Sequence, residues 1–288
     1  MTKTVETRDS RCADVSFYGC VFLQPGSYTL WTVLFDRTGG KHNVKMNRVR
    51  IPEWRGDPLP ELNVQSPRAE FPVITESSDG LKTAMPGHLH LPVSNQRPIQ
   101  LDMLFVIRPS EQSAEDSNNG ALAAIGTLSQ MKLMGSSMSV VGFDLVKHEV
   151  MFTEDDAGKI DFPRLVDRIS KSWSNRAVSI DALRPLKTEA EFFRQFLQQK
   201  LEDSSKLPRV VVVISESVQF DRGADLRPIK LNQDCRCRVF YVTIQRNKET
   251  FNDLGTLLKP VATRSFNVTS GQDMRKALAA IVHEIETF

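Results

Sequence analysis

The chain has 288 residues, of which 40% are hydrophobic and 25% are charged. This composition is ordinary for a globular protein and excludes wholesale disorder. With 37 basic and 35 acidic residues the formal net charge is only +2, which provides no basic footprint for nucleic acid or an anionic membrane surface. The apolar runs are too short to cross a bilayer, and the polar residues 1–10 lack the apolar core of a signal peptide. We therefore expect a protein that either stays inside the cell or has lost a signal segment.

The first part of the chain, residues 1–97, is predicted to be all-β. Segments rich in aromatic and β-branched residues are separated by turn signals at the spacing of a small β-sandwich; they cover residues 15–23, 28–35 and 44–51. In the third segment the apolar positions change parity, from Val44 and Met46 to Val49 and Ile51, which predicts a β-bulge. The proline-rich residues 52–97 are expected to form an irregular connector with late strands at 70–75 and 88–93.

The cysteines and histidines suggest no metal site. Cys12 and Cys20 are close enough to form a disulfide across a hairpin in an oxidising compartment. Cys235 and Cys237 are separated by one residue, whereas a redox C-x-x-C motif has two. A four-cysteine zinc site would need two C-x-x-C pairs, which the sequence lacks. We expect ordinary thiols or a single disulfide. His88 and His90 would lie on the same face of a predicted strand. We favour a solvent-exposed face there over a pair of metal ligands.

From residue 98 to residue 288 strands and helices alternate, which is typical of a mostly parallel sheet between helical layers. The predicted strands cover residues 101–107, 139–145, 149–152, 209–214, 238–244 and 264–268. The predicted helices cover residues 119–134, a segment capped by Asp161, a segment opened by the capping box at Thr188, residues 249–258 and a last helix capped by Ser270. The acidic residues 154–158 are expected to be a solvated turn, since no EF-hand ligand spacing follows them.

The strand at 101–107 is almost entirely apolar and ends at the charged, proline-marked loop that begins with Arg108. Ligands of open α/β sheets bind just beyond the carboxyl ends of such strands, so this loop is the first place to look for function. The chain contains no G-x-S-x-G, P-loop, G-x-G-x-x-G or H-E-x-x-H motif. The five histidines lie in segments that do not suggest one pocket. We therefore predict a protein that is not an enzyme.

The order strand, helix, hairpin, helix, strand, helix, strand over residues 98–288 resembles a von Willebrand factor type A domain. The closing segment, Val239 to Ile285, is most similar to variants in exported bacterial proteins, in which a short β-sandwich precedes the domain. The resemblance implies an α/β, Rossmann-like, mostly parallel sheet flanked by helices. It also implies an immunoglobulin-like sandwich in residues 1–97 and an extracytoplasmic location.

In that family a divalent cation is held by a D-x-S-x-S loop after the first strand, by a threonine and by an aspartate after the fourth strand. The resemblance places Arg108, Ser110 and Gln112 in the first loop, Thr188 at the threonine and Glu216 at the last aspartate. A guanidinium at the first ligand position has no lone pair and opposes a cation by charge, so we predict a degenerate site without metal. Arg108 either pairs with Glu216 or both side chains point into water.

These observations predict a non-catalytic, metal-independent protein-binding or scaffold module of the bacterial cell envelope. Its binding surface would comprise the loops at residues 108–118, 174–188 and 216–236, and its partner would be an unidentified protein. No cofactor, nucleic acid or membrane insertion is expected. The alternatives are a metal-dependent adhesion domain, an enzyme with an unfamiliar site, or a structural domain whose partner contacts are made by the β-sandwich.

Overall fold

The computed structural model describes most of the α/β region and parts of the amino-terminal region. The described residues are 22–23, 25–36, 38–53, 69–70, 74–76, 82–84, 91–107, 124–129, 131–156, 160–161, 164–165, 168, 187–202, 207–220, 225–229, 235–244 and 251–288. Those before residue 73 belong to one compact unit, and those from Ile74 onward belong to a second. Each unit is described by itself.

A long β-hairpin dominates the described part of the first unit. Strands β2 (Gly26–Phe35) and β3 (His42–Ile51) pair antiparallel without a break in register, so the predicted bulge is wrong. The parity change has another cause. Apolar residues occupy both faces of this ribbon, and neither face is buried, so nothing restricts them to one parity. The exposed large side chains are Leu30, Trp31, Val33, Leu34, Phe35, Val44 and Met46.

The hairpin turns between Phe35 and His42. The Asp36 carboxylate accepts the Thr38 N–H at 2.8 Å, and the backbone N–H of Asp36 donates to the Lys41 carbonyl at 2.8 Å. Gly40 has a φ of 63°, a left-handed conformation that favours glycine. Besides this ribbon, β1 (Phe22–Leu23) pairs with β4 (Ala69–Glu70) over two residues. Two packed sheets are not seen among the described residues of this unit, so the β-sandwich stays a prediction.

The second unit is built on a six-stranded sheet with the order β11-β10-β8-β12-β13-β14. Its strands are β8 (Gln100–Ile107), β10 (Ser137–Asp144), β11 (Glu149–Glu154), β12 (Arg209–Ser215), β13 (Cys237–Ile244) and β14 (Ala262–Val268). Neighbouring strands are parallel, except that β11 pairs antiparallel with β10. The first strand of the sheet, β8, lies in the middle. The next two strands, β10 and β11, are added on one side of β8, and β12, β13 and β14 follow on its other side. This sheet fits the predicted α/β fold, a mostly parallel sheet flanked by helices.

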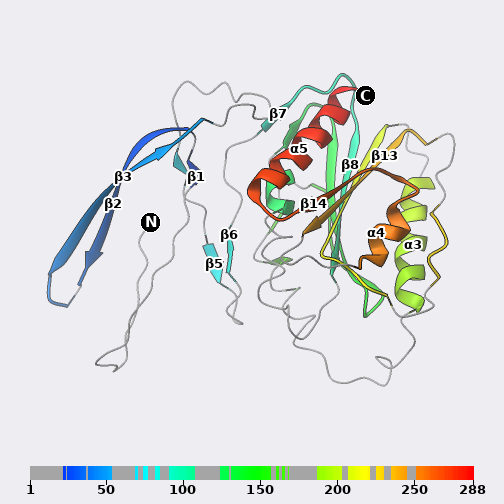
Figure 1. The fold of residues 1–288 in the computed structure, drawn as a ribbon, viewed down its shortest axis with the longest axis horizontal. Coiled ribbons are helices and arrows are strands. Elements are labelled where there is room, and N and C mark those ends of the chain that lie inside the picture. The colour runs from blue at the N-terminus through cyan, green and yellow to red at the C-terminus, as the bar shows by residue number, and fades with distance from the viewer. Residues whose placement is uncertain are drawn as a thin grey trace. The chain divides into compact units, whose positions relative to one another are not determined.

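Helices cover both faces of the sheet (Figure 1). On one face, α3 (Lys187–Glu202) and α4 (Asp253–Leu258) pack Phe193, Leu197, Leu254 and Leu257 against the sheet. On the other face lie α5 (Gly271–Glu286) and the helical residues 124–129, which contribute Ile125, Leu128, Leu278, Ile281 and Ile285. Because both faces are covered, β8 and β12 are buried almost throughout and read as continuous apolar runs.

Short strands flank the sheet. β5 (Ile74–Glu76) pairs with β6 (Lys82–Ala84), and β7 (Leu91–Val93) pairs in parallel with β9 (Met131–Leu133). The predicted helix over residues 119–134 is therefore wrong at its end, because residues 131–133 are a strand. The side chain of Asn95 stabilises the segment that follows, since it accepts the Met134 N–H at 2.9 Å and donates to the Met134 carbonyl at 2.8 Å.

Two predicted helix caps in the second half, Asp161 and Ser270, are confirmed. The Asp161 carboxylate accepts the Arg164 N–H at 3.0 Å. Ser270 is the N-cap of α5, and its hydroxyl accepts the Asp273 N–H. Asn252 is the N-cap of α4. Each cap supplies an acceptor to an N–H that has no partner within its own helix.

Candidate functional site

The strand order reverses between β8 and β12, and ligands of such sheets bind beyond the carboxyl ends of the strands at this point. Ser215, the last residue of β12, lies opposite Val106 of β8, so Glu216 follows at the level of Ile107. Glu216 is partly exposed. The predicted residues Arg108, Ser110 and Gln112 lie outside the described residues, and the proposed pairing of Arg108 with Glu216 stays a prediction.

Helix α3 brings a second predicted residue to this edge. Phe192 contacts Phe143 near the carboxyl end of β10, at a ring distance of 6.2 Å. At the other end of the helix, the Leu201 carbonyl lies 3.9 Å from the sulfur of Cys237, where β13 begins. The helix therefore runs antiparallel to the strands, and its first turn, which contains Thr188, lies at the carboxyl edge. Thr188 is the second residue of the helix rather than the residue before it, so the predicted cap position is shifted by one or two residues.

A chain of hydrogen bonds connects three segments at this edge. The amide of Asn252 donates to the Tyr241 hydroxyl at 2.9 Å, and this hydroxyl lies 2.9 Å from the hydroxyl of Ser215. Ser215 in turn donates to the Glu216 carbonyl at 2.6 Å. These hydrogen bonds hold the backbone of Glu216 in one position relative to β13 and α4.

The phenol at the centre of this chain is buried, with Tyr241 only 2% exposed. Burial raises the pKa of Tyr241 above its usual value of 10.0, since desolvation disfavours the phenolate. Tyr241 is therefore neutral near pH 7 and acts as a hydrogen-bonding group, not as a base. Gly255 makes the close packing possible, because a Cβ there would lie 3.2 Å from the Tyr241 ring and 3.1 Å from the Asn252 amide.

The segment after Glu216 is anchored to the start of α4. The Asp253 N–H donates to the Val218 carbonyl at 2.8 Å, and the Asp253 carboxylate accepts the Phe220 N–H at 2.7 Å. Val218 and Phe220 are both buried. These contacts hold residues 216–220 against the sheet although the segment has no regular secondary structure.

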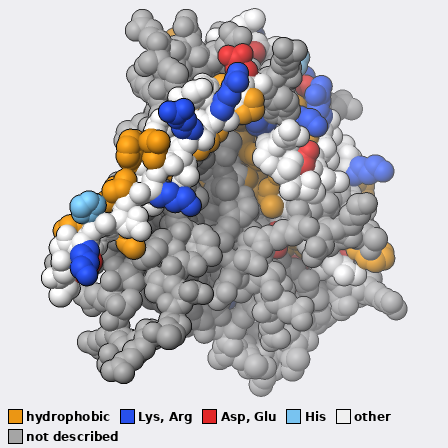
Figure 2. Space-filling model, turned by 60° about the vertical axis from the view of Figure 1, so that its left-hand side comes forward, with side chains coloured by type: hydrophobic (Ala, Val, Ile, Leu, Met, Phe, Trp, Pro, Cys, Tyr) orange, Lys and Arg blue, Asp and Glu red, His pale blue; other side chains and the backbone are white. Residues whose placement is uncertain are grey.

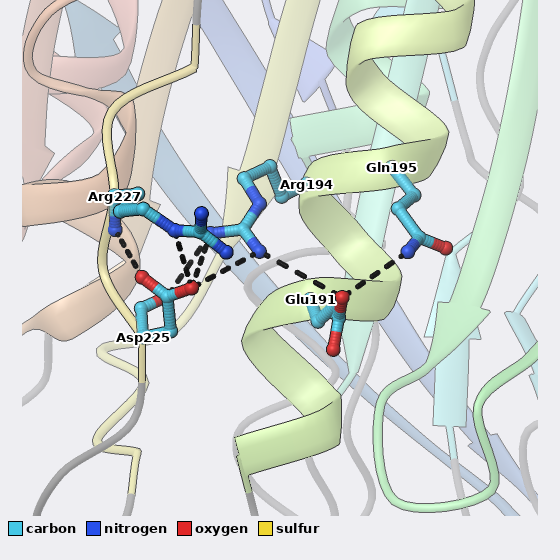
Figure 3. A network of polar contacts seen from close by, with 5 residues as sticks. All are labelled: Glu191, Arg194, Gln195, Asp225 and Arg227. Carbon is cyan, nitrogen blue, oxygen red and sulfur yellow. Dashed lines mark hydrogen bonds and ion pairs between the residues drawn. The ribbon is translucent and has the colours of Figure 1, made fainter.

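A second group of contacts holds residues 225–227, which lie between β12 and β13, against α3 (Figure 3). The Arg194 guanidinium donates to the Asp225 carbonyl at 3.3 Å and lies 3.5 Å from its carboxylate. Arg227 donates its backbone N–H at 3.0 Å and its guanidinium at 2.6 Å to the same carboxylate. The backbone N–H of Arg227 lowers the pKa of Asp225 below its usual 3.8, and the two guanidinium groups add to this effect. Asp225 is therefore ionised near pH 7 and keeps both arginines as partners.

The acidic side chain at the end of β10 also has a local structural role. Asp144 is 1% exposed, and its carboxylate accepts the backbone N–H groups of Val146 and Lys147, each at 3.0 Å. These bonds shape the tight turn into β11, in which His148 has a φ of 53°. Among the residues that the structure describes, no three His, Cys, Asp or Glu side chains form a group that could hold a metal ion.

The site residues that sequence reasoning missed come from separate segments: Arg194, Asp225, Tyr241 and Asn252. One signal was present, since Tyr241 and Thr243 are polar residues two apart in an otherwise apolar strand and therefore share a face. Nothing in the sequence indicated that Arg194 would meet Asp225. A cavity of about 270 Å³ lies elsewhere, near the amino end of β10, and is lined by Ser129, Met131, Lys132, Leu133, Ser136, Met138 and Asp156.

Comparisons with known proteins leave the family open. No family model matches the chain, and no curated protein is significantly similar in sequence. Among solved structures, it is similar to the conserved hypothetical protein BatB from Bacteroides thetaiotaomicron, with 12% identity, a TM-score of 0.42, and coverage of 66% of this chain and 100% of that chain. It is also similar to the ArnB paralog VWA2 from Sulfolobus acidocaldarius, with 13% identity and a TM-score of 0.40. This match covers 66% of this chain and 46% of that chain. No helix in the described ranges is long and apolar enough to span a membrane.

Proposed function

We propose that this chain is a non-catalytic, metal-independent protein-binding or scaffold module that works in the bacterial cell envelope. Its binding surface is the carboxyl edge of the six-stranded sheet, where the connection from β12 to β13 begins at Glu216. The partner is a protein. The location in the envelope rests on the resemblance drawn from the sequence.

The observation that carries the proposal is the double anchoring of this connection. Residues 216–220 are held by Asp253 and by the hydrogen-bond chain through Tyr241, and residues 225–227 are held by Arg194. A loop that is ordered before binding loses less conformational entropy when a partner docks. Binding surfaces benefit directly from such preorganisation.

The same contacts support a non-catalytic role. Several of the polar side chains that the structure describes at this edge shape the loops. The Asp144 and Asp253 carboxylates accept backbone N–H groups, and Tyr241 is buried and neutral. A catalytic base or nucleophile needs a shifted pKa together with access to substrate.

Metal independence can be tested by thermal unfolding with and without millimolar Mg²⁺, Mn²⁺ or Ca²⁺. We expect no change in Tm. An ion that binds only the folded state would add about 2.7 kcal/mol at about 100 times its dissociation constant. A rise in Tm that corresponds to this gain in free energy would contradict the proposal and favour metal-dependent adhesion.

The binding edge can be tested with two matched charge reversals. Glu216→Lys changes the carboxyl edge, whereas Glu154→Lys changes the end of the outermost strand β11, which lies opposite Val140 and away from the carboxyl edge. Wild type and Glu154→Lys should capture the same proteins from a cell extract by cross-linking, and Glu216→Lys should lose them. Equal capture by all three chains would refute this edge as the binding surface, and no capture by wild type would refute a protein-binding role.

A further inference from the structure

Two cysteines with one residue between them form a disulfide at the entrance to β13. Cys235 and Cys237 are bonded to each other, with their Cα atoms 5.1 Å apart. The carbonyl of the intervening Arg236 accepts the Arg209 N–H at 3.0 Å, which holds this segment beside the start of β12. We propose that Cys235 and Cys237 are a reversible thiol–disulfide exchange site that reacts with low-molecular-weight thiols and disulfides.

The position of the bond argues against a purely structural role. A disulfide stabilises a fold mainly by closing a loop in the unfolded chain, and its effect grows with the length of that loop. Here the loop contains only the two cysteines and Arg236, so the stabilisation is near the least that a disulfide can provide. The bond also connects no two elements of the fold, since it joins the first residue of β13 to a residue just before that strand.

The surroundings of the two sulfurs favour exchange. Cys235 and Cys237 are both partly exposed, so a small thiol can reach them, and the neighbouring Arg236 is exposed. A cation beside a cysteine favours the thiolate, which is the form that attacks a disulfide. Arg238 follows directly and lies 3.4 Å from Glu284, so its charge is largely compensated. Arg236 is therefore the flanking cation that would act on Cys235.

The fold offers a partner to each redox state. The sulfur of Cys237 lies 3.9 Å from the Leu201 carbonyl in the last turn of α3. A reduced thiol can donate to this carbonyl, whereas a disulfide sulfur has no hydrogen to donate and bonds to Cys235 instead. The strand pairing at this position, Arg209 opposite Cys237, involves backbone groups and does not depend on the sulfur–sulfur bond. Reduction can therefore proceed while the sheet stays folded.

The two cysteines have different roles in the proposed reaction. The carbonyl end of α3 lies beside Cys237 and disfavours a negative charge there, so Cys235 is the first nucleophile. Its thiolate attacks one sulfur of a small disulfide, which forms a mixed disulfide at Cys235 and releases one small thiolate. Cys237 then loses its proton to solvent and attacks the sulfur of Cys235, which releases the second small thiolate. Two electrons pass from the dithiol to the small disulfide, and reduction is the reverse.

The exchange can be measured on the full chain in a Cys12→Ser, Cys20→Ser background, which leaves only Cys235 and Cys237. The chain is equilibrated in mixtures of reduced and oxidised glutathione, its free thiols are alkylated in acid, and the peptides are analysed by mass spectrometry. We expect the pair to change from disulfide to dithiol as reduced glutathione increases, with an unchanged far-UV circular dichroism spectrum. In Cys237→Ser, Cys235 should accumulate a stable mixed disulfide with glutathione.

Three outcomes would overturn the proposal. The pair could stay oxidised in excess reduced glutathione, it could stay reduced in excess oxidised glutathione, or it could exchange only after urea unfolds the chain. A Cys235→Ser variant whose Cys237 forms the mixed disulfide as rapidly as Cys235 does in Cys237→Ser would overturn the assignment of the first nucleophile.

Discussion

A buried ion pair at the amino end of the sheet should contribute strongly to stability. The carboxylate of Asp102 in β8 lies 3.3 Å from the guanidinium of Arg209 in β12, and the side chains are 1% and 6% exposed. The same carboxylate accepts the Ser139 hydroxyl at 2.6 Å and the Gln100 amide at 3.0 Å, and Arg209 donates to the Lys200 carbonyl. Removing one partner leaves the other charge buried without compensation. Arg209→Met should therefore lower the free energy of unfolding by about 3–5 kcal/mol.

Urea unfolding followed by circular dichroism measures this change, which corresponds to a fall in Tm of about 6–20 °C for a domain of this size. Arg238→Met is the matched control, because Arg238 pairs with Glu284 at the surface and its loss should cost at most about 1 kcal/mol. The double variant Asp102→Leu, Arg209→Met should recover most of the loss, since it buries no unpaired charge. An Arg209→Met chain within about 1 kcal/mol of wild type would refute the reasoning.

Three further predictions concern the core, a helix cap and the anchored connection. Phe143→Ala should cost about 3–5 kcal/mol in urea unfolding, because this buried ring meets three aromatic rings of α3 edge-on; a cost below about 1 kcal/mol would contradict that packing. Hydrogen bonds from Ser270 and Thr269 lower the pKa of Asp273 below 3.8, so its contribution to stability is complete above that value and is lost as pH falls through the lower folded-state pKa. Asp273→Asn should therefore lose less stability than wild type between about pH 6 and about pH 3, and equal losses would argue against this bonding. Arg194→Met should speed amide hydrogen exchange at residues 225–229, and unchanged exchange would show that Asp225 is held without it.

The central sheet could be predicted from the sequence because its strands are covered on both faces. An almost continuous apolar run such as 209–214 has few alternatives to a buried strand. The errors occurred where this condition fails. In the β2–β3 hairpin neither face is buried, so the apolar pattern does not report the register. Residues 131–133 pair with β7 as a parallel strand, and no sequence pattern in either segment indicates this pairing.

The edge that carries the candidate site could also be predicted, because it follows from where parallel strands end. The individual contacts could not. Asp102 and Arg209 each occur as one charged residue in an apolar strand, and their encounter depends on the register between β8 and β12. Tyr241, Ser215 and Asn252 likewise come from three segments whose proximity only the fold creates.

The exposed β2–β3 ribbon affects how copies of the chain behave in solution. One face carries Trp31, Val33, Phe35, Val44 and Met46. Basic and hydrophobic side chains lie next to one another along the ribbon (Figure 2). Arg48 lies on this apolar face, and Lys45 lies on the opposite one. In two copies that approach through their ribbons, these like charges repel one another, which limits edge-to-edge aggregation. Salt screens this repulsion over a Debye length that falls from about 30 Å at 0.01 M to about 3 Å at 1 M, while the apolar attraction persists. We therefore expect added salt to reduce the colloidal stability of this protein.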